Sequence, residues 1–170
     1  MGYTHYWTVP STHPGYTAAW PGIVADARRI ITAVRAAGIV IAGPDGYHRP
    51  TCDLVEGIAF NGDATSDLDY ETFWLQPPGW APRCARGFCK TERRPYDLAV
   101  AAVLLRCHLL LPDLFAIGSD GDWDREWLYG AIPSAPDARH TRPGARRLVA
   151  ELFGPVPDAS PFQRPPNWQD

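Results

Sequence analysis

The longest apolar run in the chain covers residues 98–105 and follows directly on a stretch of polar and cationic residues. A helix with no polar face over two turns is expected to lie buried in the middle of a fold. Pro95 has the backbone angle of a first helical turn, and Asp97 places a carboxylate where the helix dipole favours negative charge. We therefore predict a buried central helix that begins at Pro95 and stops before Pro112.

A second helix is predicted for residues 21–37, where apolar residues recur at helical spacing. Pro21 suits the first turn of this helix, and Gly38 supplies its stop signal. The apolar stripe consists of Ile23, Val24, Ala27, Ile30, Ile31 and Val34. Shorter helices are predicted for residues 123–129 and 144–153.

Strands are predicted from short apolar or β-branched runs that end at turn residues. They cover residues 3–9, 39–42, 57–60, 72–76 and 114–117. Alternation along the first of them puts Tyr3, His5 and Trp7 on one face. The acidic residues 63–69 separate two of the strands, and we predict that they form an ordered loop or lid near a binding pocket.

This order of elements predicts an α+β domain. We expect a single mixed or antiparallel sheet of about five strands, with the two main helices packed on one face. A doubly wound sheet fits less well, because two consecutive strands have no helix between them. Residues 1–153 would form this domain, and residues 154–170, which include five prolines, would form a non-helical tail.

Composition and charge narrow the classes of partner. The 170 residues are 45% hydrophobic and 21% charged, as in a soluble globular protein, and the formal net charge is −3. That charge gives no reason to expect generic nucleic-acid or membrane binding. The first residues lack the basic and apolar regions of a secretory signal, so we expect a cytoplasmic protein. The sequence does not decide whether the protein forms a homo-oligomer.

No metal or cofactor is expected. Cys84 and Cys89 are close enough in sequence to share a zinc ion, but no second tight pair accompanies them. Asp120, Asp122 and Asp124 are spaced like the start of a calcium loop that lacks its later glycine and glutamate. In a reducing compartment we expect reduced thiols at Cys52, Cys84, Cys89 and Cys107.

Short polar clusters stand at the ends of the predicted strands and helices, where ligand groups usually gather. The sequence contains no phosphate-binding glycine loop, nucleophile elbow or dinucleotide fingerprint that would assign a function directly. The clusters are Thr4-His5-Tyr6, Asn61-Gly62, Tyr70-Glu71-Thr72, Cys89-Lys90-Thr91, Arg94-Pro95-Tyr96-Asp97 and Ser119-Asp120-Gly121.

The first functional hypothesis is a pocket for a phosphate-bearing small molecule, in the first place a nucleotide or a nucleotide-derived signal. Lys90, Thr91 and Arg94 precede the predicted central helix, whose free N–H groups favour an anion. Tyr6, Trp7 or Trp123 would stack on a base. Asn61, Ser119 and Asp120 would bind the polar groups of the ligand.

The rival hypothesis is a hydrolase or transferase that cleaves a glycosidic or phosphoester bond. Glu71, Asp97 or Asp120 would act as acid, base or nucleophile, and His5 would assist. A histidine between two aromatic residues on a strand also fits a hydrogen-bonded core position. A third hypothesis is a protein-interaction module that docks a partner on an aromatic surface.

Scattered motifs over nearly the whole chain carry a resemblance to a known family. The chain opens with MGYTHYW, continues with FNG and with FCKT followed by RPYD, and then has SDG before a Trp-rich segment. In these motifs it resembles a family of short uncharacterised proteins of phages and bacteria. The resemblance implies a common fold and a phage or mobile-element origin, and it carries over no catalytic residue.

Overall fold

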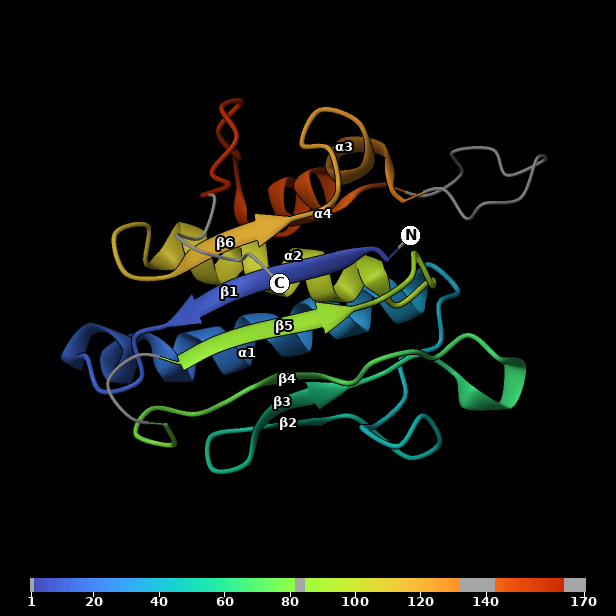
Figure 1. Ribbon diagram of the computed structural model, residues 1–170, viewed down its shortest axis with the longest axis horizontal. Helices are drawn as coiled ribbons and strands as arrows, with labels where there is room; N and C mark the ends of the chain where they lie inside the picture. The colour runs from blue at the N-terminus through green and yellow to red at the C-terminus, as the bar shows by residue number, and fades with distance from the viewer. Residues whose placement is uncertain (1, 82–84, 132–142, 164–170) are drawn as a thin grey trace.

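The computed structural model describes residues 2–81, 85–131 and 143–163. Six strands run side by side across the front of the molecule, and the helices α1, α2 and α4 lie behind them (Figure 1). The described chain is therefore an α+β fold, as predicted, but its strands form two sheets of three and not one sheet of about five.

The first sheet has the order β5-β1-β6, with both neighbours antiparallel to the central strand. Its strands are β1 (Thr4–Val9), β5 (Ala85–Lys90) and β6 (Ala116–Ser119). The predicted alternation of β1 is confirmed, because Tyr3, His5 and Trp7 are all buried, whereas Tyr6 and Thr8 on the other face are partly exposed. Gly87 of β5 lies opposite Trp7, and a Cβ atom there would come within 2.2 Å of the indole ring. The position therefore requires glycine.

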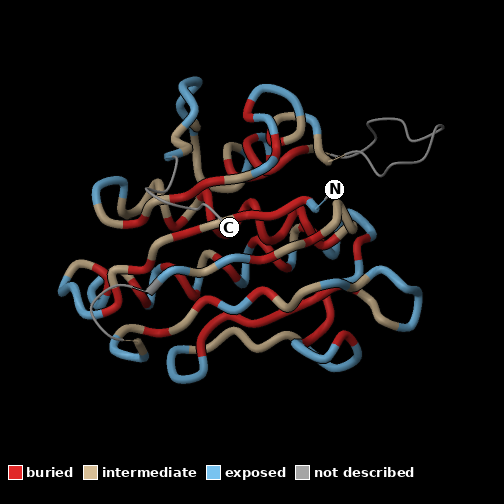
Figure 2. The backbone as a smooth tube through the Cα atoms, viewed as in Figure 1, coloured by how far each residue is buried: buried red, intermediate tan, exposed pale blue. Residues whose placement is uncertain are grey.

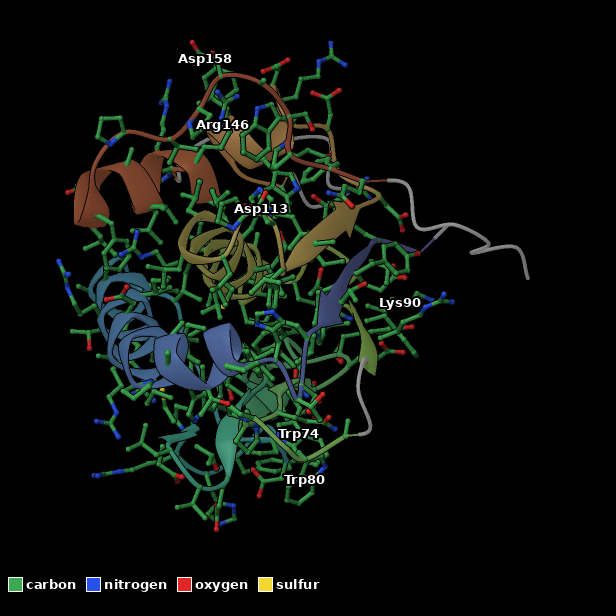
Figure 3. All side chains as sticks on the ribbon, turned by 90° about the vertical axis from the view of Figure 1, so that its left-hand side faces the viewer. Trp74, Trp80, Lys90, Asp113, Arg146 and Asp158 are labelled. Atoms are coloured by element: carbon green, nitrogen blue, oxygen red, sulfur yellow. The ribbon has the colours of Figure 1, made fainter. Side chains whose placement is uncertain are left out.

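The second sheet continues from the first at β5 and curves under α1 (Figures 1 and 3). Its antiparallel strands are β2 (Thr51–Asp53), β3 (Gly57–Phe60) and β4 (Phe73–Leu75). Glu71, just before β4, donates its backbone N–H to the Lys90 carbonyl at 3.2 Å. This contact does not extend into a ladder between β4 and β5, which belong to separate sheets. Pro77 and Pro78, just after β4, have no N–H to donate.

Helix α1 (Pro14–Ala36) begins seven residues before its predicted start. The His13 side chain caps it by accepting a hydrogen bond from the Gly15 N–H at 3.0 Å. Tyr16 and Trp20 extend the buried stripe toward the N-terminus, so the helix continues through Pro21. Their aromatic anchors outweigh the one backbone hydrogen bond that Pro21 cannot make.

Helix α2 (Asp97–Leu110) is the buried centre of the fold, as its apolar run predicts. It packs against α1, β1, β6 and α4 (Ala145–Phe153). Figure 2 shows the red of buried residues concentrated along these contacts. Both α4 and the short helix α3 (Glu126–Tyr129) fall within their predicted ranges. Among the described residues, no helix combines the length and hydrophobicity that crossing a membrane requires.

The predicted strands differ from the observed ones in four places. Residues 39–42 contribute only one bridge, between Ala42 and Asn61. Strand β2 was not predicted, and β5 occupies a segment expected to be irregular or a polar loop. The last strand lies two residues later than predicted and ends at Ser119.

The described part of the predicted tail, residues 154–163, is non-helical and lies on the domain. Phe162 packs against Trp123 and Trp127, with ring centroids 5.4 and 4.9 Å apart. The Gln163 N–H then donates to the Ile117 carbonyl at 3.0 Å. Residues 164–170 lie outside the described residues.

Candidate functional site

The polar clusters meet at one end of the first sheet. The antiparallel register pairs Thr4 with Lys90 and His5 with Ser119. The start of β1 therefore lies between the ends of β5 and β6. The first turn of α2 packs beneath this end and brings Asp97 to the same place. Residues far apart in the sequence thus form one site.

A chain of hydrogen bonds runs through this end of the fold. Ser119 Oγ lies 2.9 Å from His5 Nδ1, and His5 Nε2 lies 2.7 Å from Asp97 Oδ1. Thr91 Oγ1 also contacts Asp97 Oδ1, at 2.5 Å. The two contacts that join Ser119, His5 and Asp97 are called the Ser119–His5–Asp97 relay below. It has the order nucleophile, base and orienting carboxylate that nucleophilic catalysis uses.

The proton positions in the relay follow from its donors. The Gly121 N–H and the Trp127 Nε1–H both point at Ser119 Oγ, at 2.9 and 3.1 Å, and both groups can only donate. The Ser119 hydroxyl must therefore donate its own proton to His5 Nδ1. His5 then carries its proton on Nε2 and donates it to the Asp97 carboxylate, which also accepts the Thr91 hydroxyl proton.

Ser119 is the most exposed of the three relay residues. His5 is 0% exposed and Asp97 is 6% exposed, whereas Ser119 is partly exposed. Tyr3 and Trp127 clamp the imidazole edge-on, with ring centroids 5.3 and 5.4 Å from it. The base and its carboxylate are thus shielded from water, and the serine end lies nearest the surface.

Tyr3 closes one side of the site as a neutral phenol. Burial raises its pKa well above the usual range, and the Asp97 carboxylate raises it further. The Arg93 guanidinium lies over the Tyr3 ring at 4.2 Å. A Cβ atom on Gly121 would come within 2.2 Å of the Tyr3 hydroxyl oxygen. Glycine at 121 therefore allows the loop after β6 to lie against this ring.

The other two candidate catalytic carboxylates hold the backbone of the site. Glu71 Oε2 accepts the Lys90 N–H at 2.7 Å, and Asp120 Oδ2 accepts the Thr4 N–H at 2.9 Å. The Glu71 carbonyl also accepts the Tyr96 hydroxyl proton at 2.7 Å. These bonds fix the strand ends that carry the relay.

The cations expected to bind phosphate all have protein partners. Lys90 Nζ lies 3.2 Å from Glu92 Oε1, and this hydrogen bond raises the pKa of Lys90. Arg94 Nη1 donates to the Asp67 carbonyl at 2.5 Å. Figure 3 shows the Lys90 side chain directed away from the body of the fold. The described residues thus bring these cations near the relay without converging them on a single point.

Asn61 organises the loop that was expected to form a lid. Its Nδ2 donates to the Tyr70 carbonyl at 3.0 Å, and its Oδ1 accepts the Tyr70 N–H at 3.1 Å. Residues 63–69 are ordered, with a 3₁₀ turn at Ala64–Ser66. Lys90 Nζ lies 5.4 Å from the Tyr70 ring, which places this loop beside the site. Its order is as predicted, and its role as a lid stays a prediction.

The aromatic residues expected to stack on a base lie in different surroundings. Trp7 is 4% exposed and packs against Phe73, and Trp123 is 5% exposed and donates its Nε1–H to the Asp158 carbonyl. Tyr6 is partly exposed on the outer face of β1. The two tryptophans therefore belong to the core, and Tyr6 faces away from the relay.

The thiols and acidic groups form no metal site within the described residues. Nowhere there do three His, Cys, Asp or Glu side chains gather in a way that could hold a metal ion. Cys52, Cys89 and Cys107 are free, and Cys84 lies outside the described residues. Burial raises the pKa of the Cys89 and Cys107 thiols, so both stay protonated at neutral pH.

Trp127 was not assigned to the site from the sequence, and Gly121 was named only as part of a polar cluster. Trp127 supplies an N–H to Ser119 and a wall to His5, and the Gly121 backbone supplies the second N–H. Tyr3 had been placed on the face of His5 by strand alternation, but its contact was not foreseen. No pattern links Trp127 to the relay, since it lies in a short helix after an irregular loop.

Comparison with known proteins gives no information on function, so the function has to be inferred from the residues of the site. No family model, no curated protein and no solved structure matches the chain.

Proposed function

We propose that this chain is a hydrolase of ester bonds, with Ser119 as the nucleophile and His5 as the general base. This proposal rests on two contacts of His5: Nδ1 lies 2.9 Å from Ser119 Oγ, and Nε2 lies 2.7 Å from Asp97 Oδ1. A nucleophile within hydrogen-bond reach of a base, and a base oriented by a third group, is the signature of nucleophilic catalysis. The proposal takes up the rival hypothesis of a hydrolase or transferase, but it replaces the glycosidic or phosphoester bond with a carboxylic ester and the carboxylate nucleophile with a serine.

In the first half of the reaction, Ser119 Oγ forms a bond to the ester carbonyl carbon. The serine proton passes to His5 Nδ1, and the resulting imidazolium is stabilised by the Asp97 carboxylate at Nε2. Collapse of the tetrahedral intermediate breaks the bond to the leaving alcohol, which takes the proton from Nδ1. In the second half, water gives its proton to Nδ1, attacks the acyl-enzyme and releases the acid, and the proton returns to Ser119.

Two groups assist the serine directly. The Gly121 N–H and the Trp127 Nε1–H converge on Oγ, where negative charge develops as the proton leaves. Preorganised donors in a site of low dielectric stabilise such charge strongly. Asp97 and Thr91 act as positioning residues, because they hold the imidazole and contact no reacting atom.

The charges around the relay favour this proposal over a phosphate pocket. Lys90, Arg93 and Arg94 each have a partner in Glu92, Glu126 or the Asp67 carbonyl. The Glu92 and Glu126 carboxylates thereby offset two of the three positive charges that a phosphate would need. No observation among the described residues favours nucleotide binding specifically, so that hypothesis stays a prediction.

A fluorophosphonate probe tests the proposal directly. The Ser119 oxygen would form a bond to phosphorus while fluoride leaves and His5 takes the serine proton. We expect one adduct per chain in intact mass spectra, assigned to Ser119 by peptide mapping. Ser119→Ala should remove the adduct, and His5→Gln should slow labelling by about 10²–10⁴-fold, the usual contribution of a general base.

Ser66 provides a matched control within the same chain. It is exposed, and its hydroxyl lies 2.6 Å from a carboxylate oxygen of Asp63, with no imidazole in the contact. It should stay unlabelled. Equal labelling of Ser66 and Ser119, or no labelling of folded protein, would mean that the relay is only a buried structural network.

A further inference from the structure

A hollow lies on the outer face of the second sheet, on different elements from the relay. It has a volume of about 490 Å³, which is within the range of small-molecule sites. Its lining residues are Pro44, Thr51, Val55, Glu56, Ala59, Thr72, Trp74 and Trp80. We call it the Trp74–Trp80 groove.

Two exposed tryptophans form the wall of this groove. Trp74 is 41% exposed and Trp80 is 58% exposed. Their rings meet edge to face, with centroids 5.5 Å apart and planes at 69°. Figure 3 shows the two side chains next to each other at the end of the molecule that holds the second sheet. The fold thus leaves two indole faces at a steep angle in contact with water, beside the 80% exposed Val55.

A carboxylate stands at the edge of the same wall. Asp53 Oδ1 accepts the N–H groups of Val55 and Glu56, at 2.8 and 2.7 Å, and so fixes the turn that carries them. Trp74 Nε1 donates to the Glu56 carbonyl at 3.3 Å, which ties this turn to the ring. The Glu56 carboxylate forms no ion pair with any described residue. Among the described lining residues it is the single charged group.

We propose that the Trp74–Trp80 groove binds a small organic cation of the quaternary-ammonium type. Indole faces attract such cations more strongly than other aromatic rings do, and the uncompensated Glu56 charge complements them. Apolar walls suit the methyl groups of the ligand. A neutral polar ligand would find fewer partners, because the Thr72 hydroxyl already donates to the Pro44 carbonyl at 2.6 Å.

Choline and its neutral isostere 3,3-dimethylbutan-1-ol separate charge recognition from apolar fit. Binding of each to the full chain would be measured by isothermal titration calorimetry and by ligand-observed NMR. Choline should bind saturably, at least tenfold more tightly than the alcohol. Trp80→Ala and Glu56→Gln should each weaken choline binding tenfold or more, with melting temperatures unchanged.

Two matched variants control for exposed rings and exposed carboxylates elsewhere. Phe88→Ala removes a ring that is 60% exposed on the first sheet, and Glu151→Gln neutralises an exposed carboxylate on α4. Both should bind choline like the unmodified chain. Equal binding of choline and the alcohol, unchanged binding by Glu56→Gln, or no saturable choline binding in the millimolar range would overturn the proposal. Tighter binding of a trimethyllysine peptide than of choline would also overturn it, because the ligand would then be a protein.

Discussion

His5 Nε2 and Asp97 Oδ1 lie 2.7 Å apart, although 92 positions separate the two residues in the chain. This contact joins the central strand of the first sheet to the first turn of the buried helix. Both groups are almost fully excluded from water, so the His5 Nε2–H depends on Asp97 for its acceptor. The same contact therefore bears on stability and on the proposed chemistry.

Removing the Asp97 carboxylate should destabilise the fold. Asp97→Ala leaves the His5 N–H and the Thr91 hydroxyl without an acceptor, and we expect a loss of about 3 kcal/mol in the free energy of unfolding. Asp97→Asn retains one acceptor oxygen and should cost about 1 kcal/mol. Urea unfolding at pH 7 measures both. Asp113→Ala, at an exposed position after α2, is the control, and an equal loss in that variant would contradict the expected role of Asp97.

Two glycine-to-alanine substitutions should change stability in opposite directions. At Gly87 the new Cβ atom would meet the Trp7 ring at 2.2 Å, and Trp7 cannot move easily because Phe73 packs against it. Gly87→Ala should therefore cost about 1–3 kcal/mol. Gly22, inside α1, has nothing within 4 Å of the same atom. Gly22→Ala should stabilise the helix by about 0.5–1 kcal/mol, and thermal or urea unfolding distinguishes the signs.

The central elements follow from the sequence because burial leaves a strong pattern. The all-apolar run of α2 and the stripe of α1 both predict buried helices correctly. Strand β5 was missed because Arg86, Gly87 and Lys90 have little strand character. It forms because β1 supplies a partner, with Gly87 under Trp7 and Cys89 in the core. The division into two sheets depends on such long-range pairing, which local patterns do not encode.

The site was predictable in its residues but not in its contacts. Polar clusters at element ends included His5, Thr91, Asp97 and Ser119, and the strand register pairs His5 with Ser119. Which carboxylate meets the imidazole depends on how α2 packs under the sheet, so Glu71, Asp97 and Asp120 could not be ranked. Trp7 was assigned to a ligand although its alternation with His5 already placed it on the inner face.

Asp63 caps the 3₁₀ turn of the 63–69 loop, because its carboxylate accepts the Thr65 N–H at 3.0 Å. The pH dependence of stability should reveal this cap. Hydrogen bonds from Ser66 and Thr65 lower the pKa of Asp63 below its usual value. A lowered folded-state pKa stabilises the fold above the unfolded-state pKa, near 4, and this stabilisation is lost as the pH falls through the folded-state pKa. Asp63→Asn should therefore lower the melting temperature at pH 7, and the difference should shrink below about pH 4.

Asp113→Asn corrects this comparison for the general loss of one negative charge. A difference between Asp63→Asn and the unmodified chain that stays constant from pH 7 to about pH 3 would exclude the cap as its cause.

Replacing Trp127 by Phe should separate the proposed chemistry from simple architecture. Phenylalanine keeps an aromatic wall beside His5 but removes the N–H that Ser119 Oγ accepts at 3.1 Å. We expect fluorophosphonate labelling of Ser119 to slow by about tenfold or more, because Oγ loses one of the two donors that stabilise its negative charge as the proton leaves. Trp123→Phe is the matched control. It removes a similar buried hydrogen bond, from Nε1 to the Asp158 carbonyl at 2.7 Å, without touching the serine. Both variants should lose about 1 kcal/mol of stability, but only Trp127→Phe should label slowly. If the two label at the same rate, the Trp127 N–H supports the fold and not the reaction.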